Sequence, residues 1–416
     1  MRSPDIAVPK IFRGWIVVAA AFLLTFVGFG CAYSFSSFLT AFQAEFGASR
    51  GSVSLVFSLA GFLYFALGPV SGALADRWGV RVLAAAGMGL LGLGLILAGR
   101  ASTLEQVYLA YGLGVGLGVG CAYVPALAAV QRWFVKRRGL ASGLAVSGIG
   151  VGTLVLPPLA TWLIGHLDWR NAYLVLGMLA IALGGVAAWF MEDGPAARGQ
   201  YPDGLRPAAA SLAGQREGLS VHEAVRTRPF RGLYIACLTG SLGVFVPFVH
   251  LVPYAVEHGV PASAAAWLLA AIGIGSTAGR FVLGGMADKV GRERFLIGMH
   301  LGMAAALAIW AASGTLLALA MFALVFGLFY GGWVAVLPAV VADLYGARHA
   351  GAVIGVLYTS VALGTLIGPS GAGFMHDVFH DDLLSIIACA ASNAIAAAIL
   401  FFMLRKPAAT KEAACA

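Results

Sequence analysis

The sequence GALADRWGVR at residues 72–81 returns in shortened form as GGMADKVGR at residues 284–292. Asp76 and Asp288, the acidic residues of the two copies, are 212 residues apart. An apolar pattern recurs at that same offset, with Gly139, Gly143, Gly152 and Pro157 matching Gly351, Gly355, Gly364 and Pro369. A charged motif and an apolar motif in one register predict that the chain consists of two halves related by duplication.

Apolar residues dominate the composition. Of 416 residues, 60% are hydrophobic and only 11% are charged, whereas a soluble domain has about 25% charged residues. So few charges cannot cover a water-facing surface. The composition therefore argues against a soluble enzyme and a disordered protein, and it predicts an all-α polytopic membrane protein.

Twelve apolar runs are long enough for the roughly 20 residues that cross a bilayer as a helix. They cover residues 14–41, 52–75, 80–99, 104–130, 139–165, 170–191, 229–257, 262–287, 293–312, 314–342, 350–376 and 383–404. We expect twelve transmembrane helices in two pseudo-symmetric six-helix bundles, residues 1–191 and 229–416. The Gly-, Pro- and Arg-rich segment 192–228 is expected to be a cytoplasmic linker, in which Ser220 and Glu223 predict a capping box.

Lysine and arginine are unevenly divided between the two sides that these spans define. Of 26 such residues, 22 fall on the side of both termini, three on the other side (Arg50, Arg100 and Arg170), and Arg280 lies within a span. Because cytoplasmic loops carry the excess of cations, both termini are predicted to be cytoplasmic, in a bacterial inner (plasma) membrane. The net charge of +8 then reflects topology, and nucleic acid is not expected as a partner.

Two motifs resemble those of known transporters. The repeated loop resembles the loop motif of the major facilitator superfamily, which implies a gating role for Gly72, Asp76, Arg77, Gly79, Arg81, Asp288, Lys289 and Arg292. The run WFVKRRGLASGLAVSG at residues 133–148 resembles the fifth-helix signature of the monocarboxylate transporters. Its Lys136, Arg137 and Arg138 are interpreted as an anchor at the cytoplasmic surface, without substrate contact.

Arg280 is the one full charge deep inside a predicted span. An arginine there costs roughly 2.5–3.5 kcal/mol on insertion scales, and no acidic residue lies in the interior of any span to neutralise it. Guanidinium binds carboxylate through two parallel hydrogen bonds, so we expect Arg280 to hold an anionic substrate. The resemblance also places the family's substrate-binding arginine in this helix. Snorkelling toward the cytoplasmic surface is the competing interpretation.

The chain departs from the monocarboxylate transporters of animal cells at two positions. Those proteins carry an Asp one turn before this arginine, where the chain has Ser276, and a first-helix lysine, where it reads Phe35-Ser36-Ser37-Phe38. The related oxalate–formate exchangers carry a second cation in the eleventh helix, where this chain has Tyr358 and Thr359. One buried cation favours a monocarboxylate over a dicarboxylate.

Other residues are candidates for the substrate cavity or for coupling. Those predicted to line the cavity beside Arg280 are Ser276, Tyr33, Tyr123, Tyr330, Trp333 and Tyr358, although aromatic side chains in membranes often serve packing instead. His250 is a candidate for proton coupling or an outer gate, because histidine titrates in the useful pH range. A hydrogen-bonded packing residue is the alternative. An outer-surface cluster of titratable residues is expected to belong to a solvated loop, with a proton-attracting role as the alternative; its members are His376, Asp377, His380, Asp381 and Asp382.

We therefore predict a secondary transporter that moves a small monocarboxylate, of lactate or pyruvate type, with a proton by alternating access. The alternatives are an organic anion exchanger of oxalate–formate type, a drug/proton antiporter, and a membrane receptor that binds without flux. The sequence has no nucleotide-binding loop, nucleophile triad or metal-ligand spacing, so we expect no enzymatic activity, cofactor or metal. The expected partners are the anion, the proton and the lipid bilayer; an accessory subunit is not specified.

Overall fold

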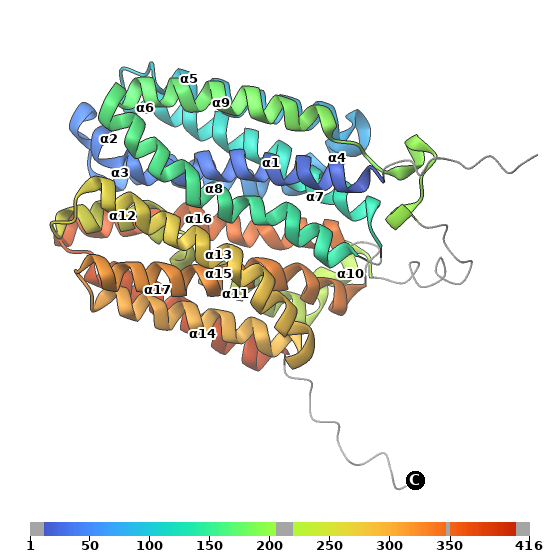
Figure 1. Cartoon of the computed structure of the whole chain (residues 1–416). Coiled ribbons are helices and arrows are strands. Elements are labelled where there is room, and N and C mark those ends of the chain that lie inside the picture. The colour runs from blue at the N-terminus through green and yellow to red at the C-terminus, as the bar shows by residue number, and fades with distance from the viewer. Residues whose placement is uncertain (1–11, 136, 205–218, 347–349, 405–416) are drawn as a thin grey trace, which may run out of the picture.

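The chain folds into long helices that run side by side (Figure 1). The computed structural model describes residues 12–135, 137–204, 219–346 and 350–404, and every regular element in these residues is helical. A helix satisfies its backbone hydrogen bonds within one segment, which the interior of a bilayer demands. The all-helical class predicted from the composition is confirmed.

Among the described residues, the first half of the chain forms nine α-helices, and some neighbouring helices join end to end within a span. In chain order its elements are α1 (Gly14–Tyr33), η1 (Ser34–Ser37), α2 (Leu39–Phe46), α3 (Arg50–Ala66), α4 (Gly68–Trp78), α5 (Val80–Ala98), α6 (Leu104–Val107), η2 (Tyr108–Leu113), α7 (Gly114–Trp133), α8 (Arg138–Leu167) and α9 (Trp169–Phe190).

The second half follows a connection with little regular structure among its described residues. That connection contains η3 (Pro195–Arg198), η4 (Pro202–Gly204) and α10 (Val221–Arg226), and α10 begins with the predicted capping box of Ser220 and Glu223. The helices of the second half are α11 (Arg228–Val244), α12 (Pro247–Glu257), α13 (Ala262–Val290), α14 (Arg292–Ala311), α15 (Leu316–Tyr345), α16 (Ala350–Phe379) and α17 (Leu383–Leu404).

The helices account for the predicted spans. Within the described residues, eleven helical stretches are long and apolar enough to cross a membrane, and α3 with α4 makes a twelfth if this pair, bent by 53°, is counted as one span. Pro69 follows the break between the two helices, where its missing N–H removes a helical hydrogen bond.

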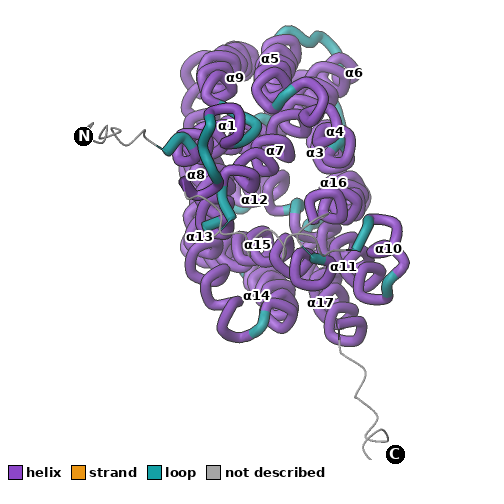
Figure 2. The backbone as a smooth tube through the Cα atoms, turned by 90° about the vertical axis from the view of Figure 1, so that its right-hand side faces the viewer, coloured by secondary structure: helices purple, strands orange, loops and turns teal. Residues whose placement is uncertain are grey.

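The helices form two groups, α1–α9 and α11–α17, which lie next to each other when seen end-on (Figure 2). The groups touch chiefly through two helix pairs, α3 with α16 and α8 with α13. In the second pair the backbones approach closely, because a Cβ on Gly273 would lie 2.5 Å from the carbonyl oxygen of Gly150. Small residues allow helices to approach in this way. This crossing holds the middle of α13, which carries Arg280, against the opposite half.

The two ends of the helical groups differ in their elements. The start of α1 and the helix α10 lie at one end, which the cation distribution predicts to be cytoplasmic, and α2 and α12 lie at the other (Figure 1). The end with α2 and α12 is called the outer end below.

Candidate functional site

Arg280 is buried in α13, with 5% of its surface exposed. Its Nη1 donates a hydrogen bond to the Oγ of Ser276, one turn earlier, at 2.7 Å. Its Nε and Nη2 are buried and have no hydrogen-bond partner among the described residues. Unpaired buried donors on a charged group cost free energy, so the guanidinium is suited to bind an acceptor from outside the chain.

Aromatic side chains form most of the wall of a cavity between the two halves. Its lining residues are Phe29, Tyr33, Phe65, Tyr123, Ile149, Phe245, Tyr330, Trp333, Val334, Leu337, Tyr358 and Val361. The structure thus brings together the five aromatic residues that the sequence predicts for the cavity. The indole N–H of Trp333 is buried there without a hydrogen-bond partner among the described residues.

Arg280 reaches the same region from α13. The guanidinium lies close enough to the side chains of Tyr330, Tyr123 and Tyr33 for electrostatic coupling with them. Tyr33 and Tyr330 come from opposite halves, and their hydroxyl oxygens lie 3.1 Å apart. The predicted substrate residues therefore meet between the halves, where one buried positive charge faces phenol hydroxyls and apolar rings.

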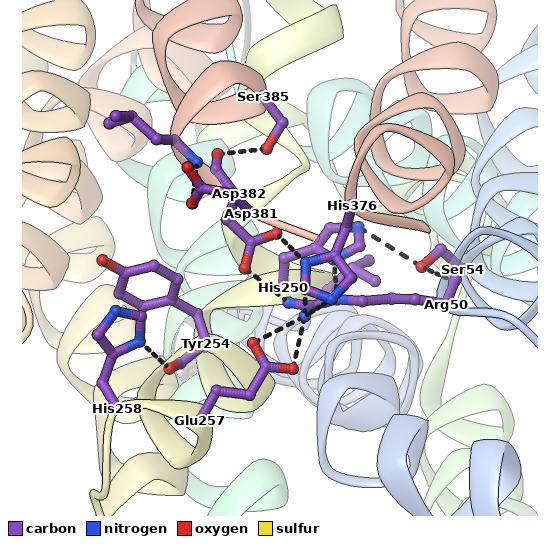
Figure 3. Close-up of polar contacts among 12 residues, drawn as sticks. Arg50, Ser54, His250, Tyr254, Glu257, His258, His376, Asp381, Asp382 and Ser385 are labelled. Atoms are coloured by element: carbon purple, nitrogen blue, oxygen red, sulfur yellow. Dashed lines mark hydrogen bonds and ion pairs between the residues drawn. The ribbon is translucent and has the colours of Figure 1, made fainter. Parts of the chain in front are cut away.

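His250 does not line this cavity and belongs to a separate polar cluster at the outer end (Figure 3). Its Nδ1 accepts a hydrogen bond from the Nε of Arg50 at 3.2 Å, and its Nε2 lies 2.8 Å from the carbonyl oxygen of Pro369. Both contacts are satisfied by the neutral ring with its proton on Nε2. His250 of α12 therefore connects α3 of the first half to α16 of the second.

Arg50 is the centre of this group, which we call the Arg50 cluster and define as Arg50, His250, Glu257, His376, Asp377 and Asp382. The Nη1 of Arg50 donates to both carboxylate oxygens of Glu257, at 2.8 and 3.0 Å. Its Nη2 lies 3.2 Å from Oδ2 of Asp382. Only 1% of Arg50 is exposed, whereas the Glu257 side chain is 47% exposed. The cluster is thus dry around the guanidinium and open to solvent at Glu257.

Asp382 and His376 close the cluster on the side of α16 and α17. The Nδ1 of His376 lies 3.1 Å from Oδ1 of Asp382, and the His376 ring nitrogens lie 3.3 Å from Nη1 of Arg50. Burial raises the pKa of Asp382 above its usual value, and the nearby charge of Arg50 only partly offsets this effect. The carboxyl group of Asp382 is therefore the one whose ionisation is costly in this arrangement.

The N-terminus of α3 is also hydrogen-bonded to the second half of the chain. The backbone N–H groups of Arg50 and Gly51 donate to the two carboxylate oxygens of Asp377 in α16, at 2.9 and 2.8 Å. A carboxylate at a helix N-terminus is favourable because it meets the positive end of the helix dipole. Among the ion pairs found between described residues, those that join the two halves are Arg50–Glu257 and Arg50–Asp382.

The sequence does not predict the Arg50 cluster. Residues 376–382 are expected to be solvated, but Asp382 is buried and bound to Arg50, so this expectation is wrong for Asp382. The reason is that Glu257, at the end of α12, and Asp382, just before α17, both contact Arg50 at the start of α3 in the other half. Arg50 is one of three cations on the cation-poor side, and this scarcity is the signal that could have singled it out.

Three residues of the cluster also have the spacing of metal ligands. Ligand atoms of Glu257, His376 and Asp382 lie within 4.8 Å of one another. The guanidinium of Arg50 contacts all three side chains, so the positive charge between them is that of Arg50. We therefore assign no metal to this place.

The repeated loop motif lies at the end opposite to the Arg50 cluster. Asp76 pairs with Arg132 at the end of α7, at 3.1 Å, and Arg292 pairs with Asp343 at the end of α15, at 2.7 Å. Gly79 adopts a φ of +86° in the turn between α4 and α5, a conformation that favours glycine. Arg81 donates to the carbonyl oxygen of Met191 at 3.2 Å. The side chain of Asp288 lies outside the part that the structure describes.

The predicted signature residues are at the same end. The backbone N–H of Arg137 donates to Asp203 in the connecting segment, at 3.2 Å, and Arg138 donates to the carbonyl oxygen of Phe134, at 3.3 Å. Lys136 lies outside the described residues. These contacts of Arg137 and Arg138 are thus structural ones near the connecting segment.

Comparison with known sequences identifies the family. The sequence pattern of the Major Facilitator Superfamily matches residues 21–264 and 232–414. Monocarboxylate transporter 11 of Mus musculus is 31% identical over 388 residues, which are 90% of this chain and 84% of that protein. The chain belongs to the monocarboxylate transporter family of this superfamily.

Other monocarboxylate transporters show the same relationship. Monocarboxylate transporter 3 of Rattus norvegicus is 32% identical over 380 residues, 88% of this chain and 75% of that protein. Monocarboxylate transporter 12-B of Danio rerio is 29% identical over 387 residues, 88% of this chain and 81% of that protein. The family resemblance carried by the loop motif and by residues 133–148 is confirmed.

A solved structure supports the fold. A bacterial homologue of the human lysosomal transporter Spinster, in an inward-facing and occupied conformation, superposes with a TM-score of 0.72 at 17% identity, covering 96% of this chain and all of that one. The predicted major facilitator fold of this monocarboxylate transporter family member is therefore confirmed. The boundaries at residues 191 and 229 and the roles of individual site residues remain predictions.

Proposed function

We propose that this protein carries a small monocarboxylate of lactate or pyruvate type together with a proton, by alternating access. The observation that carries the proposal is Arg280, a buried guanidinium between the halves with two nitrogen atoms lacking a hydrogen-bond partner among the described residues. Relatives named monocarboxylate transporters, similar over most of the chain, support a carboxylate as the ligand.

Arg280 would bind the carboxylate through Nε and Nη2 while Nη1 keeps its bond to Ser276. These two nitrogens present parallel donors, which match the two oxygens of a carboxylate. Charge-assisted hydrogen bonds of this kind contribute about 1.5–3 kcal/mol each. The pair of guanidinium and bound carboxylate would be neutral overall, which lowers the free-energy cost of burying each of the two charges within the membrane.

The aromatic wall would hold the remainder of the substrate. Tyr33, Tyr123, Tyr330, Trp333 and Tyr358 line the cavity, and three of them, Tyr33, Tyr123 and Tyr330, couple electrostatically to Arg280. Their rings offer apolar contact, while the phenol hydroxyls and the indole N–H can bond a hydroxyl or keto oxygen. Because one cation is present at this place, one carboxylate per substrate is favoured.

Alternating access would use the two halves as moving units. The contacts of the Arg50 cluster would close the outer end, and the loop-motif pairs Asp76–Arg132 and Arg292–Asp343 would stabilise the helix ends that move at the cytoplasmic end. We propose a bacterial inner membrane and cytoplasmic termini on the cation distribution alone. The protein would act as a carrier without enzymatic activity.

His250 is the residue that we propose for proton coupling or the outer gate, since it joins Arg50 to α16. Anion exchange is the second candidate, and one observation favours it. The residue bonded to Arg280 is Ser276 rather than an acid, so Arg280 has no adjacent carboxyl group that could exchange a proton as substrate binds and leaves.

Uptake of labelled lactate and pyruvate into proteoliposomes tests the proposal. With symport, an inward-directed proton gradient drives accumulation into vesicles that contain no substrate. With exchange, uptake requires internal anion and does not respond to the gradient. Absence of both uptake and exchange of monocarboxylates would contradict the proposed function itself.

A further inference from the structure

The Arg50 cluster brings three carboxylates of one half onto a positive site of the other. Glu257 and Asp382 contact the guanidinium of Arg50, and Asp377 accepts the first backbone N–H groups of α3. The positive site therefore consists of a side chain and the N-terminus of a 17-residue helix. Both are features to which anions bind in proteins.

Arg50 already binds a carboxylate of the other half, that of Glu257, through its Nη1 atom. Both oxygens of the Glu257 carboxylate accept from the guanidinium, at 2.8 and 3.0 Å. The Nη2 of Arg50 is buried and faces Asp382 at 3.2 Å, but has no hydrogen bond among the described residues. A monocarboxylate from solution could make the same bonds that these side chains make.

Separation of the halves at the outer end would remove all three carboxylates at once, because they belong to α12, α16 and the connection to α17. Arg50 and the N-terminus of α3 belong to the first half and would stay together. An exposed cation beside a helix N-terminus attracts anions and raises their local concentration.

We propose that Arg50 and the N-terminus of α3 form a second, outer carboxylate-binding site, which captures the substrate before it reaches Arg280. This inference rests on the proposed function, since it takes the substrate to be a monocarboxylate. Glu257 and Asp382 occupy the site when the outer end is closed. The carboxylate of the substrate therefore competes with those of Glu257 and Asp382 for the guanidinium of Arg50. Substrate binding at the outer end then favours opening.

A simple gate and a capture site predict the same effect for Glu257→Gln but opposite effects for Arg50→Gln. Both variants remove the ion pair between Arg50 and Glu257, and Arg50→Gln also removes the one between Arg50 and Asp382. If the pair only closes the outer end, both variants raise the fraction of the open state and lower the KM for external substrate. If Arg50 also binds the substrate, Glu257→Gln lowers that KM, while Arg50→Gln raises it.

The experiment measures initial uptake of labelled lactate and pyruvate into right-side-out membrane vesicles that contain the full chain. We expect Arg50→Gln to raise the external KM about tenfold, the equivalent of about 1.4 kcal/mol, and Glu257→Gln to lower it. Arg50→Lys, which keeps the charge but not the planar fork, should fall between Arg50→Gln and the unmodified protein. Arg100→Gln, an exposed cation at the same end of the same half, is the control and should leave the KM unchanged.

The possible outcomes separate the two levels of the proposal. Equal or absent shifts for Arg50→Gln and Glu257→Gln would overturn the capture site and leave the transport function intact. Absence of uptake by the unmodified protein would instead contradict the proposed function. Uptake into inside-out vesicles, which presents substrate at the cytoplasmic end, shows that a variant is folded, because a misfolded variant would transport in neither direction.

Discussion

The hydroxyl groups of Tyr33 and Tyr330 lie 3.1 Å apart and join the two halves of the molecule across the aromatic cavity. Tyr33 ends α1 and Tyr330 lies in the middle of α15, so the hydrogen bond exists only when these helices are close. It therefore belongs to the arrangement in which the halves enclose the cavity.

Replacement of either tyrosine by phenylalanine should favour opening of the halves. One neutral hydrogen bond contributes about 0.5–1.5 kcal/mol, which corresponds to a shift of about 2- to 12-fold in the equilibrium. A cysteine at Ser58, buried in α3 against α16, would report opening through its reaction with an impermeant thiol reagent. Because the two hydroxyl groups share a single hydrogen bond, the double variant should react with the thiol reagent little faster than either single variant. If the two substitutions increased the labelling rate independently, the shared hydrogen bond would be contradicted.

Gly331 should be intolerant of a side chain. A Cβ there would collide with the backbone oxygen of Ser276, so α13 and α15 would have to separate beside Arg280. Such overpacking costs typically 1–3 kcal/mol. Gly331→Ala should therefore lower the melting temperature and the uptake rate. Gly298→Ala is the matched control, because a Cβ at Gly298 meets nothing within 4 Å; equal Tm values for the two variants would contradict the packing account.

The fold follows from the sequence more directly than the site does. Apolar runs predict the spans because every helix in a bilayer must be apolar and about 20 residues long. Arg280 is conspicuous as a charge in such a run, and the aromatic residues of the cavity are plausible from their spans. Which of these aromatic residues line one cavity depends on how each helix is rotated about its own axis. Arg50 contacts Asp382 only because the ends of two helices that are distant in the sequence lie close together. Such contacts have no local signal in the sequence.

Ser276→Asp should weaken substrate binding. An Asp in this position would lie next to the Nη1 of Arg280, which now bonds to Ser276 at 2.7 Å, and its negative charge would offset the positive charge that attracts the substrate carboxylate to Nε and Nη2. A charge-assisted hydrogen bond contributes about 1.5–3 kcal/mol, so the KM should rise by roughly 10- to 100-fold. Ser276→Asn has nearly the same shape without the charge and should raise the KM much less. An unchanged KM in Ser276→Asp would speak against substrate binding at Arg280.

Closure of the outer end should depend on pH through Asp382. Burial raises the pKa of this carboxyl group in the closed arrangement, and opening returns the group to water and toward its ordinary pKa. The proton is therefore bound more tightly in the closed state. Closure is favoured at acidic pH, and this stabilisation is lost as the pH rises through the raised pKa.

Thiol labelling of Ser58→Cys across a pH series measures this dependence. Measured relative to the rate of a fully exposed cysteine at each pH, which corrects for thiolate formation, the labelling rate should increase with pH in the otherwise unmodified protein and should become nearly independent of pH in Asp382→Asn. Asp381→Asn, an exposed neighbour, should retain the pH dependence. A labelling rate that falls with rising pH would contradict the assignment.

The central claim is that Arg280 binds the carboxylate of the substrate, and binding of labelled lactate and pyruvate to purified Arg280→Gln tests it most directly. Loss of two charge-assisted hydrogen bonds, about 3 kcal/mol or more together, predicts that the Kd rises at least about 100-fold, with a Tm close to that of the unmodified protein. A Kd in Arg280→Gln equal to that of the unmodified protein would contradict the account.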